Sequence, residues 1–430
     1  MKRIACLVAL LSLPAGLWAQ ESGFSVDANF LTRGEIRDGG LVPLTDDYTP
    51  DHACFILERT LLGLHFDYKG LSTRLTAQHA GTWGSSEGGY FNVYEAWAKL
   101  ETPIGLYAQI GRQNLSYDDE RIFGADDWAM TARSHDALRL AYEGHGHKVH
   151  LIGAFNQNIE NMNGGTYYYG GLQPYKSLQA LWYHYDIPKI HLGASALFVN
   201  VGMQGGDPNE DNEKTWHQQM AGLYLSFRPK KWNVEASYYH QMGHEEHGIP
   251  INAWMASFKG SFTPGTRWSF RSGYDYLSGD ADFATPPQGM LGVARHETIH
   301  GFSSLYGSHH KFYGAMDFFY VSTYYGGFTP GLQNIYVGTS WKPTEPFSIN
   351  ADFHYLATAT KLNNAERSLG YEMELSASWK IRKETQLSLG YTFMRGTETM
   401  VLLKRATDRR QLHWGWLMLV VTPTFFSTKK

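Results

Sequence analysis

One segment of this chain has the spacing of a metal hydrolase, because the run from His296 to His300 reads His-Glu-x-x-His. In zinc proteases this spacing places both histidines on one face of a helix and leaves the glutamate as the general base. Here the β-branched residues Thr298 and Ile299 precede the second histidine and Gly301 follows it, which disfavours a helix. A chain with 19 histidines can reach this spacing by chance. We therefore predict no catalytic residue, metal site or cofactor, and keep a hydrolase or protease as an alternative.

A second set of chemically useful side chains consists of charged residues in segments of alternating polarity. From 347 to 355 every odd-numbered residue is apolar and the residues between are polar, and 369–379 and 266–276 show the same alternation. This period of two predicts strands. If such strands cross a membrane, the charges must face inward, because Arg or Lys facing lipid near the midplane costs about 2–4 kcal/mol. We therefore predict that the pore is lined by Asp27, Arg33, Arg59, Arg74, Glu95, Lys99, Arg139, Arg271, Asp275, Asp352, Glu372 and Glu374.

These inward charges have both signs. Rings of Arg or Lys favour anions in a pore, and rings of Asp or Glu favour cations. The arginines of the set could form a basic track, whereas Asp352, Glu372 and Glu374 lie toward the C-terminus. Alternatively, the charges pair across the wall and stiffen it, since Arg–carboxylate pairs are strong and geometrically specific. The sequence leaves both interpretations open.

A third group of arginines and aspartates lies in and beside the link that follows the segment 104–114. The guanidinium groups could meet a carboxylated sugar at the mouth of a pore through bidentate hydrogen bonds. They could instead pair with the aspartates and order a long loop, and we favour this structural role. The group consists of Arg112, Arg121, Asp127, Arg133 and Asp136.

The elements that carry these side chains are joined by links that alternate between short and long. Tyr68-Lys69-Gly70, Gly144-His145-Gly146 and Pro264-Gly265 are short links, and the links between such turns are long and polar. Outer-membrane barrels have short periplasmic turns and long outer loops. The pattern predicts an all-β fold, an 18-stranded antiparallel transmembrane β-barrel. The expected strands are 24–36, 53–68, 71–82, 91–101, 104–114, 134–144, 147–157, 175–186, 189–202, 215–228, 231–242, 251–263, 266–278, 331–342, 346–358, 368–380, 384–395 and 412–426.

The link 279–330 is far longer than a usual loop and is rich in aromatic residues. So many aromatic side chains favour a loop that folds into the barrel and narrows the pore. An extra strand at 311–320 would break the even strand count, and a loop that caps the outer rim is the other alternative. The residues that we expect at the constriction are Tyr306, His310, Lys311, Tyr313 and Asp317.

The N-terminus and the composition set further bounds. Residues 1–19 have the positive start and apolar core of a secretory signal, which leaves 20–430 as the barrel. Loss of Lys2 and Arg3 changes the formal charge from -4 to -6, which does not favour nucleic acid as a partner. Beyond the signal, no stretch approaches the roughly 20 apolar residues of a membrane helix. A soluble β-sandwich would share the alternation but not the signal and the loop asymmetry.

The stretch from Ile110 to Ala137 carries a recognisable signature: Gly111-Arg112-Gln113, Leu115, Tyr117, Arg121, Gly124, Asp127-Trp128, Arg133 and Asp136. This spacing resembles that of the alginate export family of outer-membrane proteins, and the segment from Leu305 to Asp317 resembles family members from the Bacteroidetes. The resemblance implies an 18-stranded barrel over nearly the whole mature chain. The family takes its name from an exporter of an anionic polysaccharide, but alginate as the cargo does not follow.

Together these features predict a channel in the outer membrane of a Gram-negative bacterium, with outer-membrane lipid around it. We expect passive passage of polar or anionic solutes, with oligo- or polysaccharides among the candidates. The prediction is a channel and not an enzyme. The alternatives are a hydrolase or protease at the barrel rim and a closed structural or adhesive barrel whose lumen is filled by side chains.

Overall fold

The computed structural model describes most of the chain, namely residues 22–39, 52–160, 162, 164–171, 173–207, 209–210, 212–280, 297–319, 329–362, 365–404 and 411–428. The signal expected over 1–19 lies outside the described residues, as does part of the long link 279–330. Within the described residues, no helix combines the length and the apolar character needed to cross a membrane.

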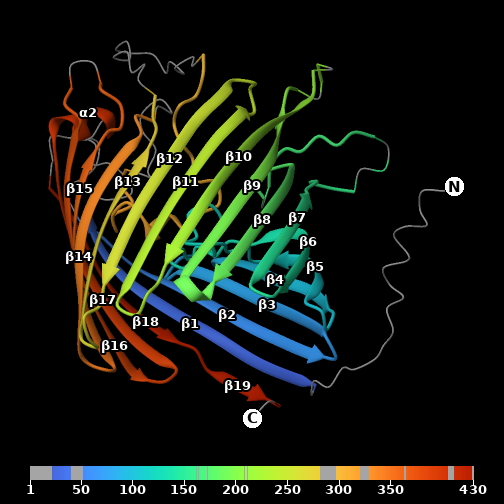
Figure 1. The fold of residues 1–430 in the computed structure, drawn as a ribbon, viewed down its shortest axis with the longest axis horizontal. Coiled ribbons are helices and arrows are strands. Elements are labelled where there is room, and N and C mark those ends of the chain that lie inside the picture. The colour runs from blue at the N-terminus through green and yellow to red at the C-terminus, as the bar shows by residue number, and fades with distance from the viewer. Residues whose placement is uncertain are drawn as a thin grey trace.

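The described strands form one antiparallel sheet that closes into a barrel, because β1 pairs with β2 on one side and with the last strands on the other. Figure 1 shows the strands running obliquely across the wall. They are β1 (Gly23–Asp38), β2 (Ala53–Tyr68), β3 (Leu71–Thr82), β4 (Tyr90–Glu101), β5 (Leu106–Gln113), β6 (His135–Gly144), β7 (His147–Phe155), β8 (Ser177–Ile187), β9 (Leu192–Gly205), β10 (Lys214–Phe227), β11 (Trp232–His244), β12 (Pro250–Phe262), β13 (Trp268–Leu277), β14 (Leu332–Thr344), β15 (Phe347–Ala357), β16 (Ser368–Arg382), β17 (Thr385–Gly396), β18 (Gln411–Val421) and β19 (Thr424–Ser427).

The prediction of 18 strand positions is confirmed, with one local difference at the closure. The strand expected over 412–426 is divided at Thr422-Pro423 into β18 and β19, and both parts pair with β1. Proline has no N–H to give to a ladder, so the pairing stops at Pro423 and resumes beyond it. The helix α2 (Glu398–Lys404), in the link between β17 and β18, is an element that the alternation did not predict.

The short links lie at the end of the barrel where β1 begins and β19 ends. At Lys69-Gly70 and at His145-Gly146 both residues have positive φ, between 45° and 82°. Two successive residues with positive φ are typical of a type I′ turn, whose twist matches that of the strands it joins. The opposite end of the barrel carries the long links, which include 114–134 between β5 and β6.

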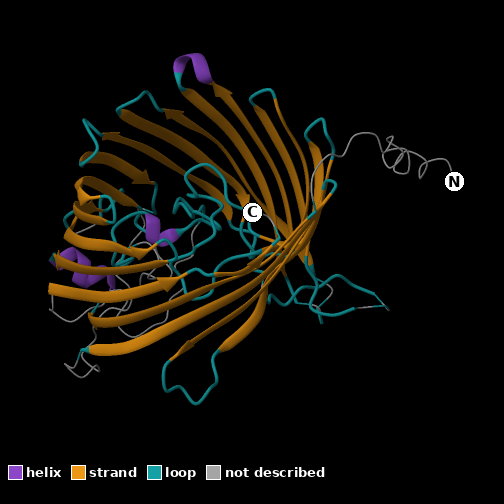
Figure 2. Cartoon of the chain, turned by 90° about the horizontal axis from the view of Figure 1, so that it is seen from below, coloured by secondary structure: helices purple, strands orange, loops and turns teal. Residues whose placement is uncertain are grey.

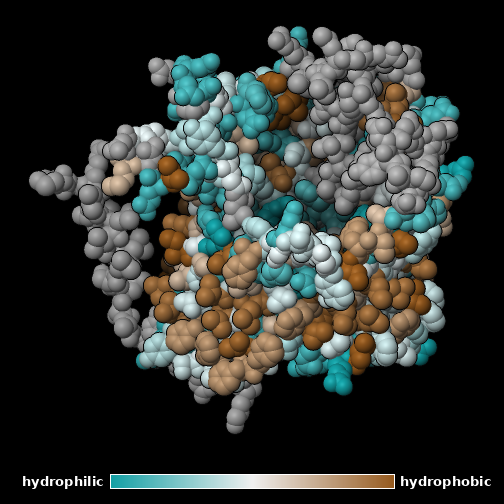
Figure 3. Space-filling view, turned by 180° about the vertical axis from the view of Figure 1, so that it is seen from behind, coloured by the Kyte–Doolittle hydropathy of each residue, from teal (hydrophilic) through white to brown (hydrophobic). Residues whose placement is uncertain are grey.

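The outer face of the wall is apolar. Along β16, exposed apolar side chains such as that of Leu375 alternate with less exposed polar side chains. Figure 3 shows these apolar side chains as a broad band around the wall, with hydrophilic residues above it. Aromatic pairs lie on the same outer face near both ends of the strands, for example Trp268 with Trp341 and Trp254 with Tyr276. This arrangement is typical of a barrel wall in contact with lipid.

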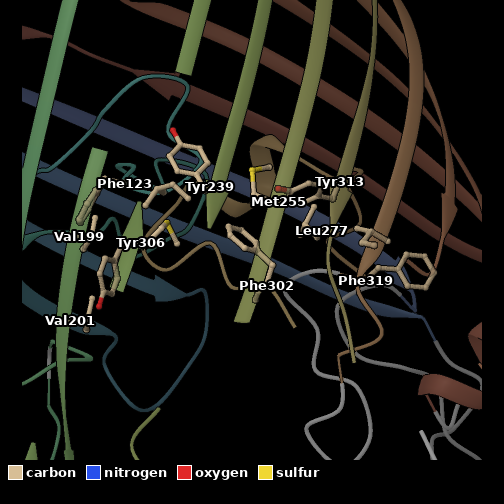
Figure 4. Close-up of a cluster of buried hydrophobic side chains, with 14 of the residues drawn as sticks. Phe123, Val199, Val201, Tyr239, Met255, Leu277, Phe302, Tyr306, Tyr313 and Phe319 are labelled. Atoms are coloured by element: carbon tan, nitrogen blue, oxygen red, sulfur yellow. The ribbon is translucent and has the colours of Figure 1, made fainter. Parts of the chain in front are cut away.

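The buried apolar cluster lies inside the barrel and not between two sheets. Figure 2 shows loop segments within the ring of strands. In Figure 4, Phe123 and Tyr306 from two loops lie against Val199 and Val201 of β9. Fully buried Phe123 belongs to the segment 114–134, which we call the first lumen loop. Tyr306 belongs to 297–319, the described part of the long link, which we call the second lumen loop.

Candidate functional site

The two lumen loops join each other inside the barrel. Phe123 and Tyr306 form a β-bridge. The backbone N–H of Tyr306 donates to the carbonyl of Ile122 at 3.0 Å, and that of Gly124 donates to the carbonyl of Tyr306 at 3.0 Å. The Ser308 hydroxyl accepts from the backbone N–H of Asp126 at 3.0 Å. The loops therefore form one unit that fills part of the lumen, as expected for the long link but not for the link after β5.

Arg121 of the first lumen loop is buried at the centre of this unit. Its guanidinium donates to the Tyr313 hydroxyl at 2.7 Å and to the Ser257 hydroxyl at 3.1 Å. It also pairs with Asp275 at 3.1 Å and with Asp119 at 3.4 Å. Burial alone would lower the pKa of Arg121, but Tyr313, Asp275 and Asp119 together hold that pKa well above its ordinary value. The sequence left Arg121 either at the pore mouth or in a loop network, and in the structure these partners enclose it inside the barrel.

The tip of the first lumen loop is held against β1 and β2. Arg33 donates to the carbonyl of Trp128 at 3.0 Å and lies over its ring at 4.1 Å. Arg59 donates to the carbonyls of Asp127 and Ala129 at 3.0 Å each. Since Arg121 contacts β12 and β13 across the ring of strands, this loop crosses the lumen.

The second lumen loop is bound to the wall by carboxylates and an amide. The backbone N–H of Ala315 donates to Glu374 at 2.8 Å, and that of Met316 donates to Glu372 at 3.0 Å. On the other side of the loop, the Gln241 side chain donates to the carbonyl of Ser303 at 2.8 Å and accepts from its N–H at 2.9 Å. Each hydrogen bond satisfies a loop group that would otherwise be buried without a partner.

The expected constriction residues of the second lumen loop lie in the lumen. The imidazole of His310 stacks on Trp128, with ring centroids 4.1 Å apart, and hydrogen-bonds Asp317 at 2.7 Å. Lys311 is half exposed and pairs with Glu120 at 3.3 Å. Tyr306 and Tyr313 are buried against the first lumen loop. Their effect on a passing solute remains a prediction.

Two polar cavities remain between the loops and the wall. The first has a volume of about 310 Å³ and is bordered by the second lumen loop and β12 to β16. The second has a volume of about 370 Å³ and is bordered by β4 to β6 and Asn114. Charged lining residues of the first cavity are Lys259, Arg271, Asp275, Lys311, Asp352 and Glu374, and those of the second are Glu95, Lys99, Glu101, Arg139 and Glu143.

Most of the predicted pore-lining residues occur in pairs on the inner wall. Arg74 pairs with Asp27 at 2.7 Å and with Glu95 at 3.5 Å. Arg271 is paired with Asp352 through two of its guanidinium nitrogens. Lys99 pairs with Glu101 at 2.7 Å, and Arg139 donates to the Gln109 side chain at 2.6 Å. Paired residues therefore border the cavities, and a role of these charges in ion selection stays a prediction.

Three predicted pore-lining residues do not face open space. Arg33, Arg59 and Glu372 are buried on the inner wall. The parity of the strands placed them on the inner face, but the lumen loops cover them there. For these residues the prediction of a pore-lining position is therefore wrong, and they anchor the loops instead.

The predicted group of arginines and aspartates divides into separate contacts. Arg112 of β5 makes a bidentate pair with Asp136 of β6, with both hydrogen bonds at 2.8 Å. Arg133 donates to the carbonyl of Gly307 at 2.8 Å and pairs with Asp126 at 3.4 Å. Asp127 is exposed and contributes its backbone carbonyl. Asp127 and Arg133 thus hold the first lumen loop to β2 and to the second lumen loop, whereas the Arg112–Asp136 pair joins two wall strands.

Two features that resemble hydrolytic sites have structural roles. His296 lies outside the described residues, and Ile299, three positions further on, forms a β-bridge with Ile251. Ser195 and His184 hydrogen-bond at 2.8 Å on β8 and β9, but the Ser195 hydroxyl donates its proton to Asp118 at 2.5 Å. That hydroxyl is buried and tied to the first lumen loop.

The sequence analysis did not include Lys259, which joins the wall to the first lumen loop. Its ammonium group pairs with Glu235 of β11 at 2.8 Å and with Asp119 at 3.0 Å. Lys259 lies on the same inward face of β12 as Ser257 and Met255. The alternation along that strand was the signal that could have identified it.

The apolar belt, the closed ring of strands and the polar lumen define the class of protein as an outer-membrane channel of the porin type. Residues 71–400 match the model of the alginate export family, and the chain belongs to that family. It therefore resides in the outer membrane of a Gram-negative bacterium. No curated protein matches the chain at a significant level.

Solved barrels from Pseudomonas aeruginosa share the fold at low sequence identity. OccK2 is 9% identical with a TM-score of 0.62, over 94% of this chain and 98% of its own. OccK9 is 12% identical with a TM-score of 0.61, over the same shares. OpdK, solved with vanillate, is 10% identical with a TM-score of 0.59, over 93% of this chain and 99% of its own. OccK2 has also been solved in complex with glucuronate.

Proposed function

We propose that this protein is a passive channel for polar or anionic solutes, with oligo- and polysaccharides among the candidates. The observation that carries the proposal is the lumen itself: two loops cross it and still leave charged cavities beside the wall. The complexes of OccK2 with glucuronate and of OpdK with vanillate support small carboxylates as a solute class for barrels of this shape.

The pairing of the cavity charges suits passage. A solute that meets Arg271 also meets Asp352, and one that meets Lys311 also meets Glu120. Conduction requires contacts that are favourable enough for the solute to enter and weak enough for it to leave. Paired charges offer polar contacts to a solute but bind it less tightly than an unpaired charge would. The lumen loops would then set the size limit and the paired side chains would replace part of the solute's hydration shell.

The same fold with a lumen sealed by its loops would be a closed structural or adhesive barrel. The large buried cluster inside the barrel is the observation that favours this alternative. The two functions differ in one measurable quantity, the ionic current through a single refolded molecule.

The test is single-channel conductance in a planar bilayer for the intact protein and for a variant that lacks Gly301–Tyr325. We expect open channels with reproducible ion selectivity and a larger conductance after the deletion. Shortening the exposed link 84–89 between β3 and β4 serves as the matched control and should leave the conductance unchanged. Barrels that fold but stay silent before and after the deletion would contradict the channel.

A further inference from the structure

A third cavity lies at the end of the barrel that carries the long links, apart from the lumen cavities. Its volume is about 570 Å³, within the range of about 300–1,000 Å³ that is usual for small-molecule sites. It is bordered by the link 156–176 between β7 and β8, the link 206–213 between β9 and β10, and the link 245–249 between β11 and β12.

Aromatic rings form one side of this cavity. The ring of Tyr169 is 75% exposed and lies 4.7 Å from the ring of Tyr167. The Tyr167 hydroxyl donates to the carbonyl of Gly206 at 2.8 Å, so the ring is tied to the opposite link. Asn158 fixes the backbone beneath Tyr169, since it accepts from the Tyr169 N–H at 2.8 Å and donates to the carbonyl of Gly170 at 2.6 Å. The exposed ring of Tyr169 thus stands on a backbone held by hydrogen bonds, beside a second ring that is tied by its hydroxyl, and can stack on a ligand.

The polar lining of the cavity is rich in acceptors and poor in free positive charge. The Lys176 ammonium group donates to the Gln204 side chain at 2.6 Å and to the Thr215 hydroxyl at 3.2 Å. Asp207 and Glu246 line the same cavity as carboxylates. His247 also lines the cavity, and its imidazole is hydrogen-bonded to Glu245 at 2.8 Å. Since Lys176 and His247 are both engaged, the two carboxylates beside them disfavour an anionic ligand and suit hydroxyl groups, which donate to carboxylates and amides.

The cavity is also connected to the lumen by a shared residue. Tyr175 lines it, and the Tyr175 ring lies 5.3 Å from the ring of Tyr306 in the second lumen loop. The Tyr175 hydroxyl is hydrogen-bonded to His135 at 2.7 Å. A ligand in this cavity would therefore be adjacent to the unit that crosses the lumen.

We propose that this cavity is a capture site for a neutral saccharide chain on its way through the barrel. A sugar ring places its C–H face on Tyr169 and Tyr167, and its hydroxyls hydrogen-bond to Asp207, Glu246 and Asn212. The inference rests on the proposed channel function and adds to it a solute class and a first binding step. It involves none of the residues that border the lumen cavities.

The test is isothermal titration of the refolded protein in detergent with neutral hexasaccharides of glucose and of mannose and with a hexasaccharide of glucuronate. We expect a neutral hexasaccharide to bind the intact protein and Tyr169→Ala to weaken that binding at least about tenfold, or about 1.4 kcal/mol. Met162→Ala is the matched control, because Met162 is 89% exposed on the same link and does not line the cavity. It should bind as the intact protein does.

Three outcomes would overturn the capture site: no binding of either neutral hexasaccharide, binding of the glucuronate hexasaccharide alone, or unchanged binding by Tyr169→Ala. Sugars of the outer leaflet have the same chemistry, so purified lipopolysaccharide is titrated in parallel. Binding of lipopolysaccharide without any free hexasaccharide would contradict capture of a solute. Conductance of the same preparations separates the two proposals, since an open channel without saccharide binding removes only this inference, and binding by a silent barrel removes only the channel.

Discussion

Arg121 is a positive charge held inside a barrel away from water. Its side chain is 1% exposed, and its partners come from its own loop, from the second lumen loop and from two wall strands. A buried ion pair adds little net stability when it is compared with an apolar replacement, but removal of one partner leaves the other charge without compensation. The role of Arg121 is therefore to fix where the first lumen loop lies.

We expect Arg121→Met to lower the free energy of unfolding by about 3–5 kcal/mol, because Asp275 would stay buried without its ion pair and Asp119 would keep only Lys259. Urea unfolding in lipid vesicles, followed by tryptophan fluorescence, measures this change. Arg112→Met is the matched control. It removes a bidentate pair of partly exposed groups, which is worth about 0–1 kcal/mol. Equal losses from the two variants would show that Arg121 is no more important than a surface pair.

His309 makes the stability of the loop unit depend on pH. Burial, together with the positive charge of Arg133, lowers the pKa of His309 from 6.5 to about 4. Between these two values the unfolded chain binds a proton that the folded protein does not bind. Since stability rises with pH wherever the unfolded state binds more protons, acidification from pH 6.5 toward 4 should destabilise the folded protein.

We expect the free energy of unfolding to fall between pH 6.5 and 4 more steeply in the intact protein than in His309→Gln, which cannot titrate there. Urea unfolding at half-unit pH steps measures both slopes. The difference between the slopes isolates His309 from the carboxylates that also titrate in this range. Parallel slopes would mean that His309 is accessible to protons in the folded state.

At the scale of elements, the two lumen loops behave as one structural unit because they contact each other at both ends. Near β9 they share the bridge between Phe123 and Tyr306. Near β1 the stack of Trp128 on His310 joins the tip of the first loop to the second. Each loop also has its own hydrogen bonds to the wall, through Arg59 and through Glu372.

We expect Trp128→Ala to raise the single-channel conductance and the current noise, because it removes the stack on His310 and the ring under Arg33. Replacement of a fully buried tryptophan by alanine costs about 3–5 kcal/mol. Trp128 is only partly buried, so the loss of stability should be smaller than that. Trp83→Ala, on the outer end of β3, is the control and should leave the current unchanged. A Trp128→Ala channel with native conductance and noise would show that this contact does not restrict the lumen.

At the scale of the whole molecule, the alternation of the strands separates lipid from lumen. Leu375 of β16 is 54% exposed on the outer face, whereas the next residue, Ser376, hydrogen-bonds Asn350 on the inner face. Substitution by arginine should therefore cost much more stability at Leu375 than at its neighbour Ser376.

We expect Leu375→Arg to cost about 2–4 kcal/mol, as for a cation on the lipid face of a barrel, and Ser376→Arg to cost much less because its side chain reaches the polar lumen. Urea unfolding of both variants in vesicles measures the difference in their free energies of unfolding. The changed electrophoretic mobility of the folded barrel in an unheated sample confirms that each variant has folded. Equal costs would contradict the assignment of the two faces.

The fold was predictable because a barrel wall is a local pattern repeated along the chain. The period of two, the short turns at one end and the long links at the other gave the strands to within a few residues and the inner position of charges such as Arg74 and Arg271. The signature from Gly111 to Asp136 indicated the family. Each of these signals depends on residues that are close in sequence.

The sequence by itself determined which residues face lipid and which face inward, and it favoured a long aromatic link that enters the barrel. Only the tertiary structure decided that the first lumen loop crosses the lumen too, and that Arg33, Arg59 and Glu372 are covered. The reason is distance along the chain: Arg121 meets Ser257 across 136 positions, and Arg33 meets Trp128 across 95. Strand parity fixes the direction of a side chain, but its partner depends on how the closed barrel brings remote segments together.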